Sequence, residues 1–430
     1  LMRNYESLPL STNGSDIDIL MMPGQETNCL YALKKALTAV SANILTEYTQ
    51  PGFHKVIVIG PDLNKTEGWW GVCIDLFFGC KFAGTAEFLD EALVLEYVEI
   101  HNGMNVLEAD LADLLGVWKH ILHHDNLPTD YLPGALQALQ KKTDLIKKFF
   151  SPVSQLVFEE FYDICQTARF NDDAQISYKI RRLRRAFTLE KFKRNRLEYI
   201  QSRIKFNLSK LYRIIYPPGF IIAVLGADGV GKSSMIEAIR PILESATHMS
   251  VQTFHLRPTL FPPLRQIYRK KSYGYKVANS VNNPHGSSQS GTVLSFLRLT
   301  WLLADYVLGY WFLVRPGLTR KAKVFIFDRY ADDLALDPKR FRIGALFGLA
   351  RLIPRLVPRP DIVLALQASP ETIYARKSEL SLPEIKRQRN ALMQWASNRP
   401  EAILISTDDH MDVTRDKCLH AILTVARRRL

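Results

Sequence analysis

The chain has 430 residues, of which 47% are hydrophobic and 23% are charged. This balance excludes a disordered or fibrous protein and suffices for two or three domains with ordinary hydrophobic cores. Lys and Arg (56) outnumber Asp and Glu (43), yet residues 1–125 hold only 7 basic against 17 acidic residues. The asymmetry predicts one acidic and one basic module, the basic one suited to phosphate-bearing or anionic partners.

The cysteine pattern and the start of the chain bear on location. The sequence has no Cys-x-x-Cys pair and no Cys/His cluster at metal-ligand spacing, so we expect a reduced, cytoplasmic setting. No apolar signal segment opens the chain. Because it begins on Leu1, we expect the first domain to be N-terminally truncated.

Residues 1–105 alternate β-rich and helical segments. The β-rich segments lie at 16–21, 54–60, 71–79 and 95–103. This alternation predicts a small α/β domain.

Three carboxylates stand out in this first domain. Asp16 and Asp18 are two residues apart on a strand, which places both side chains on one face. Asp75 lies within the apolar run GVCIDLFF, where an uncompensated charge is costly. Because neighbouring carboxylates repel unless a cation lies between them, we predict Asp16, Asp18 and Asp75 as ligands of divalent metal, suited to two-metal nucleotidyl transfer. A degenerate binding module and a surface Asp-x-Asp without a role are the alternatives.

The region resembles the nucleotidyltransferase superfamily related to polymerase beta. The resemblance rests on Gly14-Ser15 beside the Asp16-x-Asp18 strand, followed by Asp75 on a later strand. In that family the Gly-Ser pair lies further upstream, on a helix turn, whereas here it abuts Asp16. The resemblance implies a metal-dependent nucleotidyltransferase-like domain over residues 1–105.

Residues 106–216 change to a helical period, which predicts a helical connector that becomes basic toward its end. Residues 176–213 contain 13 basic and 2 acidic residues with interleaved aromatics. Three readings stay open: a solvated face with aromatics packed inward, contact with anionic membrane or an acidic glycan carrier, and nucleic acid. Of the three, nucleic acid has the least support, because no recognised nucleic-acid module accompanies the segment.

Residues 217–430 contain five apolar β-rich runs separated by helical or loop segments. The runs begin at Phe220, Val251, Lys323, Asp361 and Ala402. Continuous apolar strands separated by helices are typical of a parallel sheet covered on both faces, so we predict an α/β, doubly wound, five-stranded parallel sheet. The polar stretch 273–292 predicts a mobile loop.

Two segments of this region are long and apolar. Residues 297–314 approach the length of a membrane span but contain Arg298 and Asp305, which favours a buried amphipathic helix. The segment from Ile343 is interrupted by Pro354 and by arginines, which favours a core or interfacial helix.

The strongest motif follows the first of these strands. Residues 226–233 read Gly-Ala-Asp-Gly-Val-Gly-Lys-Ser and satisfy GxxxxGK[ST] between a strand and a helix. Glycines let backbone N–H groups surround phosphate oxygens, Lys232 supplies a positive charge, and Ser233 supplies a hydroxyl ligand for Mg²⁺. The residues expected to bind ATP are Gly226, Ala227, Asp228, Gly229, Val230, Gly231, Lys232, Ser233 and Ser234.

A second motif, Asp328-Arg329-Tyr330, ends the third strand. Because it lies at the carboxyl edge of a parallel sheet, it should face the same crevice as the phosphate loop. Asp328 could hold Mg²⁺ and Arg329 could clamp a phosphate, or the two could form a buried ion pair. Asp332 and Asp333 are interpreted as solvated loop residues.

Together these motifs resemble the thymidylate kinase family of P-loop nucleoside-monophosphate kinases over residues 218–430. Asp228 matches the family's loop acid, which contacts the substrate sugar, and Arg329 matches the arginine that orients the acceptor phosphate. The family's arginine-bearing lid corresponds to residues 376–389, which implies catalytic roles for Arg376 and Arg387. On the acceptor side, Arg257-Pro258 lacks the family's glutamate, and Arg298 is the counterpart of its nucleobase-contacting arginine.

These interpretations predict a P-loop kinase that transfers the γ-phosphoryl of ATP, with Mg²⁺, to dTMP or a related nucleoside monophosphate. Its catalytic residues would include Lys232, Asp328 and Arg329. A sugar or glycan acceptor in surface polysaccharide synthesis is one alternative, and a nucleotide-sensing scaffold without turnover is another. The expected partners are a nucleotide and a small-molecule or glycan acceptor, with peripheral contact to anionic membrane and a homodimer left open.

Overall fold

A computed structural model of the chain describes residues 1–2, 8, 15–62, 68–82, 86–123, 127, 129–168, 173–262, 291–341, 343 and 345–429. Gly14 and most of the predicted loop at 273–292 lie outside these residues. The chain divides into two compact units. The first comprises Leu1–Ala42, Glu47–Val58 and Val72–Ile215, and the second comprises Asn43–Thr46, Ile59–Gly71 and Tyr216–Leu430.

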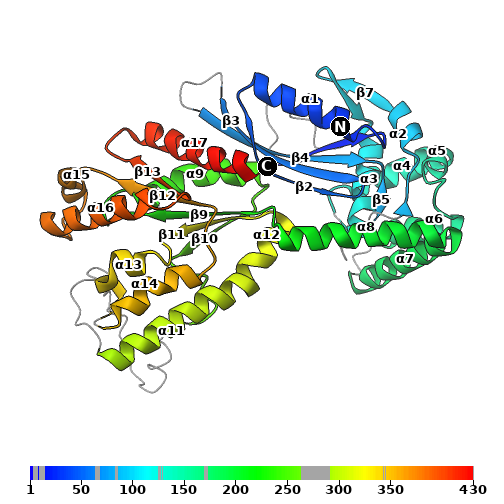
Figure 1. Cartoon of the computed structure of the whole chain (residues 1–430). Coiled ribbons are helices and arrows are strands. Elements are labelled where there is room, and N and C mark those ends of the chain that lie inside the picture. The colour runs from blue at the N-terminus through cyan, green and yellow to red at the C-terminus, as the bar shows by residue number, and fades with distance from the viewer. Residues whose placement is uncertain are drawn as a thin grey trace. The chain divides into compact units, whose positions relative to one another are not determined.

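Among the described residues, the elements before residue 216 are eight strands with helices α1 and α2 between them, followed by the helices α3 to α8 (Figure 1). They are β1 (Ile17–Met21), α1 (Glu26–Ala39), β2 (Asn43–Gln50), β3 (Phe53–Asp62), β4 (Gly68–Phe78), β5 (Lys81–Phe82), β6 (Ala86–Glu87), α2 (Glu91–Glu96), β7 (Val98–His101), β8 (Met104–Leu107), α3 (Ala109–His123), α4 (Leu132–Lys141), α5 (Thr143–Phe149), α6 (Gln155–Thr167), α7 (Asp173–Arg194) and α8 (Arg196–Ile215).

Four of these strands form one sheet in the order β1-β4-β3-β2. β1 pairs with β4 in parallel, with Asp18 opposite Asp75. This register confirms that the two β-rich runs carrying the predicted carboxylates are strands. Strand β2 was not predicted from the sequence, because its mixed polar and apolar residues give a weak strand signal.

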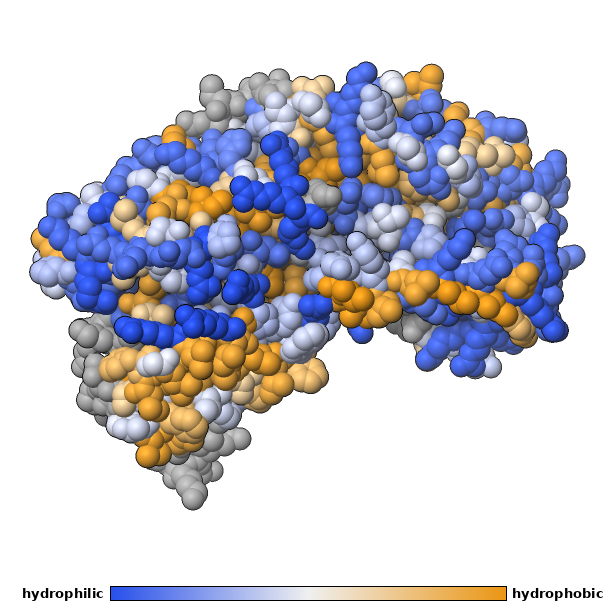
Figure 2. Space-filling view, in the orientation of Figure 1, coloured by the Kyte–Doolittle hydropathy of each residue, from blue (hydrophilic) through white to orange (hydrophobic). Residues whose placement is uncertain are grey.

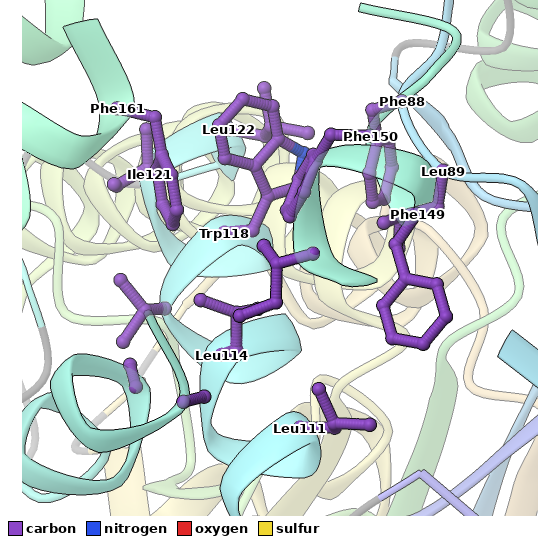
Figure 3. Packing of buried hydrophobic residues seen from close by; sticks show 14 of the residues in the cluster. Phe88, Leu89, Leu111, Leu114, Trp118, Ile121, Leu122, Phe149, Phe150 and Phe161 are labelled. Atoms are coloured by element: carbon purple, nitrogen blue, oxygen red, sulfur yellow. The ribbon is translucent and has the colours of Figure 1, made fainter. Parts of the chain in front are cut away.

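The helices α3 to α7 share a hydrophobic core with the strand region, so the segment predicted as a connector is part of a larger packed body. Trp118 is fully buried at its centre, and its ring contacts Phe150 and Phe161 edge-on at centroid distances of 4.9 and 4.5 Å (Figure 3). Phe88 and Leu89 bring residues of the predicted first domain into the same core. Such aromatic pairs add about 1 kcal/mol each beyond the burial of their area.

The elements after residue 216 alternate strands with helices. They are β9 (Phe220–Leu225), α9 (Lys232–Ala246), β10 (Val251–His255), α11 (Thr292–Gly309), the π-helical turn η2 (Tyr310–Val314), α12 (Arg315–Lys321), β11 (Val324–Asp328), α13 (Asp333–Leu336), the 3₁₀ turn η3 (Pro338–Phe341), α14 (Phe347–Leu356), β12 (Ile362–Gln367), α15 (Pro370–Arg376), α16 (Leu382–Ser397), β13 (Ala402–Ser406) and α17 (Met411–Arg429).

The five strands form one parallel sheet in the order β10-β11-β9-β12-β13, which confirms the predicted fold class. Helices cover both of its faces (Figure 1). Alternate residues of β9, such as Ile221 and Ala223, pack in one core with residues of α11, α14 and α16. In the register of β11 on β9, Asp328 lies opposite Val224, which places the Asp-Arg motif at the same edge as the loop after β9.

Helix α11 is amphipathic but less buried than the sequence suggested. The segment Thr292–Lys321 has the length and composition of a membrane-crossing helix, with a mean hydropathy of 1.3, and only 28% of its apolar window is buried. Its buried side carries the charged Asp305, whose carboxylate accepts hydrogen bonds from the backbone N–H groups of Thr259 (3.2 Å) and Phe261 (2.7 Å). Asp305 is therefore paired inside the protein, as a buried charge must be.

Candidate active site

The phosphate-binding motif forms a tight loop between the buried strand β9 and helix α9. Gly226 and Gly231 adopt φ values of 155° and 98°, which other residues adopt only with strain. A Cβ atom on Gly226 would lie 2.7 Å from the carbonyl oxygen of Leu366, whereas one on Gly231 would meet nothing within 4 Å. Gly226 thus permits close packing on β12, and Gly231 leaves the loop accessible just where α9 begins.

Lys232 opens helix α9 and is 7% exposed. Its Nζ atom donates hydrogen bonds to the carbonyl oxygens of Gly226 (3.0 Å) and Ala227 (2.8 Å) and lies 3.6 Å from Asp228 Oδ1. Burial, reinforced by the positive charge of Arg329, lowers the pKa of Lys232 to about 8. The first turn of α9 adds backbone N–H groups without helical partners, which favours anions at this end. Ser233 and Ser234 are exposed in the same turn.

Asp328 is the last residue of β11, and its carboxylate is half-buried. Its Oδ2 atom lies 3.4 Å from Nδ1 of His255, the last residue of β10. Its Oδ1 atom is buried, and no described group hydrogen-bonds to it. Burial alone would raise the pKa of Asp328, but the hydrogen bond with His255 and the charge of Lys232 outweigh burial, so the pKa lies below its ordinary value. A buried, ionised oxygen without a hydrogen bond suits a cation or an ordered water.

Arg329 joins two carboxylates with its guanidinium fork. Nη1 lies 2.5 Å from Oδ2 of Asp333, and Nη2 donates to Oδ1 of Asp228. The residue is 4% exposed and has a φ of 76°, a strained conformation for a long side chain. The Asp-Arg motif is therefore anchored to the phosphate loop, and its backbone strain is held by two charged hydrogen bonds.

Asp228 is the centre of this ion network. It contacts Arg329 and Lys232, and its Oδ2 atom lies 2.5 Å from Nη1 of Arg340. Burial would raise the pKa of Asp228, but the three cations outweigh burial and hold it well below its ordinary value. The loop acid is therefore ionised and shared by cations from three parts of the sequence.

Sequence reasoning misjudged or missed several members of the network. Asp332 and Asp333, interpreted as solvated, are 6% and 3% exposed. The prediction was wrong because the loop folds into helix α13 beneath Arg329, and burial raises the pKa of Asp332 to about 6. Arg340 was not anticipated, since its partner Asp228 lies 112 positions away.

The two arginines of the predicted lid lie in different surroundings. Arg376, at the end of α15, donates to the carbonyl oxygen of Thr407 at 2.8 Å, and Thr407 in turn donates to that of Val230 in the phosphate loop. Arg387 forms two hydrogen bonds with Glu384 on the exposed face of α16, which occupies much of the predicted lid. Their catalytic roles stay predictions, and the structure gives Arg376 a contact that braces the loop.

Arg257, which the family resemblance places on the acceptor side, forms an ion pair. Nη1 of Arg257 lies 2.6 Å from Oδ2 of Asp305 on α11, and the side chains of Arg257 and Asp305 are 11% and 0% exposed. The pair holds the bend after β10, where Leu256 and Thr259 have φ values of 70° and 59°. Arg298, the predicted base-contacting residue, is half-buried on the same helix.

The first unit brings its three predicted carboxylates together. Ligand oxygens of Asp16, Asp18 and Asp75 all lie within 4.8 Å of one another, and the latter two residues are buried. Hard oxygen donors at such spacing fit Mg²⁺ or Mn²⁺. This convergence follows from the parallel register of β1 and β4.

Two lysines already neutralise part of that charge. Nζ of Lys119 lies 3.1 Å from Oδ1 of Asp18, and Nζ of Lys55 lies 2.5 Å from Oδ1 of Asp75. Burial raises the pKa of Asp75 even though Lys55 opposes the shift. A bound cation would therefore share these carboxylates with the two ammonium groups.

No protein-family model matches the chain, and no curated protein matches it. Among solved structures, a thymidylate kinase from Ehrlichia chaffeensis is similar with a TM-score of 0.32 and 17% identity, over 48% of this chain and 100% of that one. A thymidylate kinase from Candida albicans is similar with a TM-score of 0.35 and 17% identity, over 49% of this chain and 93% of that one. About half of the chain is thus distantly similar in structure to thymidylate kinases, with a P-loop and a parallel five-stranded sheet.

Proposed function

We propose that residues 217–430 form a kinase that moves the γ-phosphoryl group of ATP to an acceptor phosphate or hydroxyl. The observation that carries the proposal is the convergence of Lys232, Asp328 and Arg329 at the carboxyl edge of the sheet, beside a complete phosphate-binding loop. Open parallel sheets bind ligands at this edge. Positioning and charge stabilisation account for most of the catalysis of phosphoryl transfer, and both require fixed cations of this kind.

On the donor side, Lys232 would exchange its bonds to the loop carbonyls for bonds to phosphate oxygens. Backbone N–H groups from the loop and the first turn of α9 would surround the same phosphates. Ser233 and Asp328 would hold Mg²⁺, and the buried Oδ1 atom of Asp328 is the observation that fits this role. When bound, the ion would neutralise charge on the β- and γ-phosphates.

On the acceptor side, Arg329 would orient the group that receives the phosphoryl. Its position is fixed by Asp228 and Asp333, so little reorganisation would be needed when an acceptor binds. Arg340, which shares Asp228, would add a second cation close to the same place.

The acceptor itself is proposed as dTMP or a related nucleoside monophosphate, with a sugar or glycan end as the alternative. The ion pair between Arg257 and Asp305 supports the alternative of a sugar or glycan acceptor, because it leaves Arg257 less able to bind the phosphate of a nucleoside monophosphate. A panel of nucleoside monophosphates, sugars and oligosaccharides, each offered with Mg·ATP, would identify the acceptor by the ADP that it causes to form. Nucleotide binding without acceptor-dependent ADP across the whole panel would instead support a nucleotide-sensing scaffold.

A second function is proposed for the first unit: divalent metal binding at Asp16, Asp18 and Asp75, in support of nucleotidyl transfer. The spacing of their oxygens supports this proposal. Mn²⁺ should raise the melting temperature of the intact protein and of an Asp144→Asn control, but not of Asp18→Asn. An equal effect of Mn²⁺ on all three proteins would overturn the assignment.

A further inference from the structure

Helix α8 presents one face to its own unit and the opposite face to solvent. The inner face carries Tyr199, Phe206 and Arg213, all half-buried, and Arg213 lies over the ring of Tyr48 at 5.0 Å. An additional bond joins Arg213 Nη2 to Gln50 Oε1 at 3.3 Å. The orientation of the helix about its axis is therefore set by contacts within the first unit.

The outer face is an aliphatic stripe along the whole helix, visible as the orange band over α8 in Figure 2. No residue of α8 is buried. The stripe runs at spacings of three and four residues, which keeps it on one side of a helix. Its members are Leu197, Ile200, Ile204, Leu208, Leu211 and Ile215, which are 68, 47, 53, 58, 51 and 55% exposed.

The neighbouring helix α7 has no such surface. Ile176, Ile180, Leu183 and Phe187 are at most 5% exposed, because they pack into the core of the first unit, and Leu189 is the exposed aliphatic residue of this helix. Among the basic residues of α7, Arg184 and Lys191 bond to backbone carbonyl oxygens of the same unit, whereas Arg181 and Arg185 are exposed to solvent. Of the two helices in the basic segment, α8 is the one that carries a continuous row of exposed aliphatic side chains beside its positive charges.

Basic side chains border the stripe on both sides. Arg196, Arg203 and Lys210 recur every seven residues and so form a row along one edge, and Lys205 lies beyond the other edge. The only acidic residue of α8 is Glu198. Long cationic side chains beside an apolar stripe can reach lipid headgroups while the stripe enters the acyl boundary.

We propose that α8 is a membrane-docking helix that lies in the surface of an anionic lipid bilayer. Charge complementarity selects this occupant over a second copy of the chain. Antiparallel pairing of two α8 stripes would place the Arg196, Arg203 and Lys210 rows side by side, where like charges repel. Anionic headgroups attract the same rows. The proposal does not depend on the kinase proposed above.

The test uses the full chain and sedimentation with vesicles of phosphatidylcholine alone or mixed with phosphatidylglycerol. We expect binding to the mixed vesicles that weakens with salt. Ile204→Gln with Leu208→Gln should lower the binding constant at least about tenfold. The matched control, Leu156→Gln with Leu189→Gln, changes two aliphatic residues that are 62 and 53% exposed elsewhere in the unit, and it should bind as the unmodified protein does.

A second pair of variants tests the role of charge. Arg196→Gln with Lys210→Gln should lower binding by roughly tenfold, whereas Arg181→Gln with Arg185→Gln on α7 removes the same net charge and should have a much smaller effect. Equal binding to both kinds of vesicle, binding that survives the stripe substitutions, or a stripe-dependent dimer in light scattering without lipid would each overturn the proposal. Because all the substituted side chains lie outside the core, circular dichroism should report unchanged folding for every variant.

Discussion

The Nη1 atom of Arg329 lies 2.5 Å from the Oδ2 atom of Asp333, four residues later on a buried turn of helix. This bond, with the one from Nη2 to Asp228, holds Arg329 in a backbone conformation that costs free energy. The network fixes a guanidinium beside the phosphate-binding loop without any ligand present. The proposed kinase would use such a fixed charge to stabilise the transition state of phosphoryl transfer.

Replacement of Asp333 by Asn tests whether this pair is structurally important. Loss of one carboxylate leaves the buried charge of Arg329 less well compensated, and we expect the free energy of unfolding to fall by about 2–4 kcal/mol. Urea unfolding measures the change. Asp409→Asn is the control, since Asp409 pairs with Lys417 at the exposed surface and should contribute less than about 1 kcal/mol. Equal stability of the two variants would contradict the network's role.

Substitution of Asp305 tests how much the buried contacts of α11 contribute to stability. If its carboxylate holds Arg257 and the backbone of Thr259 and Phe261, Asp305→Leu should destabilise the protein by about 3–5 kcal/mol, although it makes the helix more apolar. The exposed neighbour Leu308→Ala should cost less than about 1 kcal/mol. Thermal and urea unfolding distinguish the two, and an Asp305→Leu protein as stable as the parent would show that the buried contacts contribute little.

The pH dependence of stability should carry a signature of Asp332. Its pKa of about 6 in the folded protein exceeds the ordinary unfolded value of about 3.9, so the folded state holds this proton more tightly. As the pH rises from about 4 to 6, ionisation of Asp332 therefore lowers the free energy of unfolding. Above pH 6 the free energy of unfolding is lower by about 2–3 kcal/mol than it would be with Asp332 protonated.

Asp332→Asn removes the ionisation while keeping an acceptor for Trp395. We expect this variant to be more stable than the parent by about 2 kcal/mol at pH 8, with no difference near pH 4. Urea unfolding across the range measures both curves. A constant difference between them at all pH values would mean that Asp332 does not titrate as described.

The sequence was sufficient to predict the strands after residue 216, because their continuous apolar runs are buried on both faces and interrupted by clear helical segments. It was also sufficient to place Asp328 at the edge that carries the phosphate loop, since parallel strands end at a common edge. Both results depend on local pattern and on a general property of parallel sheets.

The rest depended on contacts that local pattern does not encode. Arg340 reaches Asp228 across 112 positions, and Asp305 reaches Arg257 across 48. The burial of Asp332 could not be predicted, because a solvated acidic loop and a buried helical turn can have the same local sequence pattern. Likewise, the basic segment at 176–213 reads as uniform, although α7 buries its apolar face and α8 exposes one.

The most direct test of the proposed kinase is the transfer of label from γ-labelled ATP, in the presence of Mg²⁺, to dTMP, other nucleoside monophosphates and sugar acceptors. The unmodified protein and the exposed-site control Lys321→Ala should form the same labelled product. Lys232→Ala should form it at least about a hundredfold more slowly while keeping its fold. Full activity in Lys232→Ala, or no labelled product from the unmodified protein with any acceptor, would contradict the assignment.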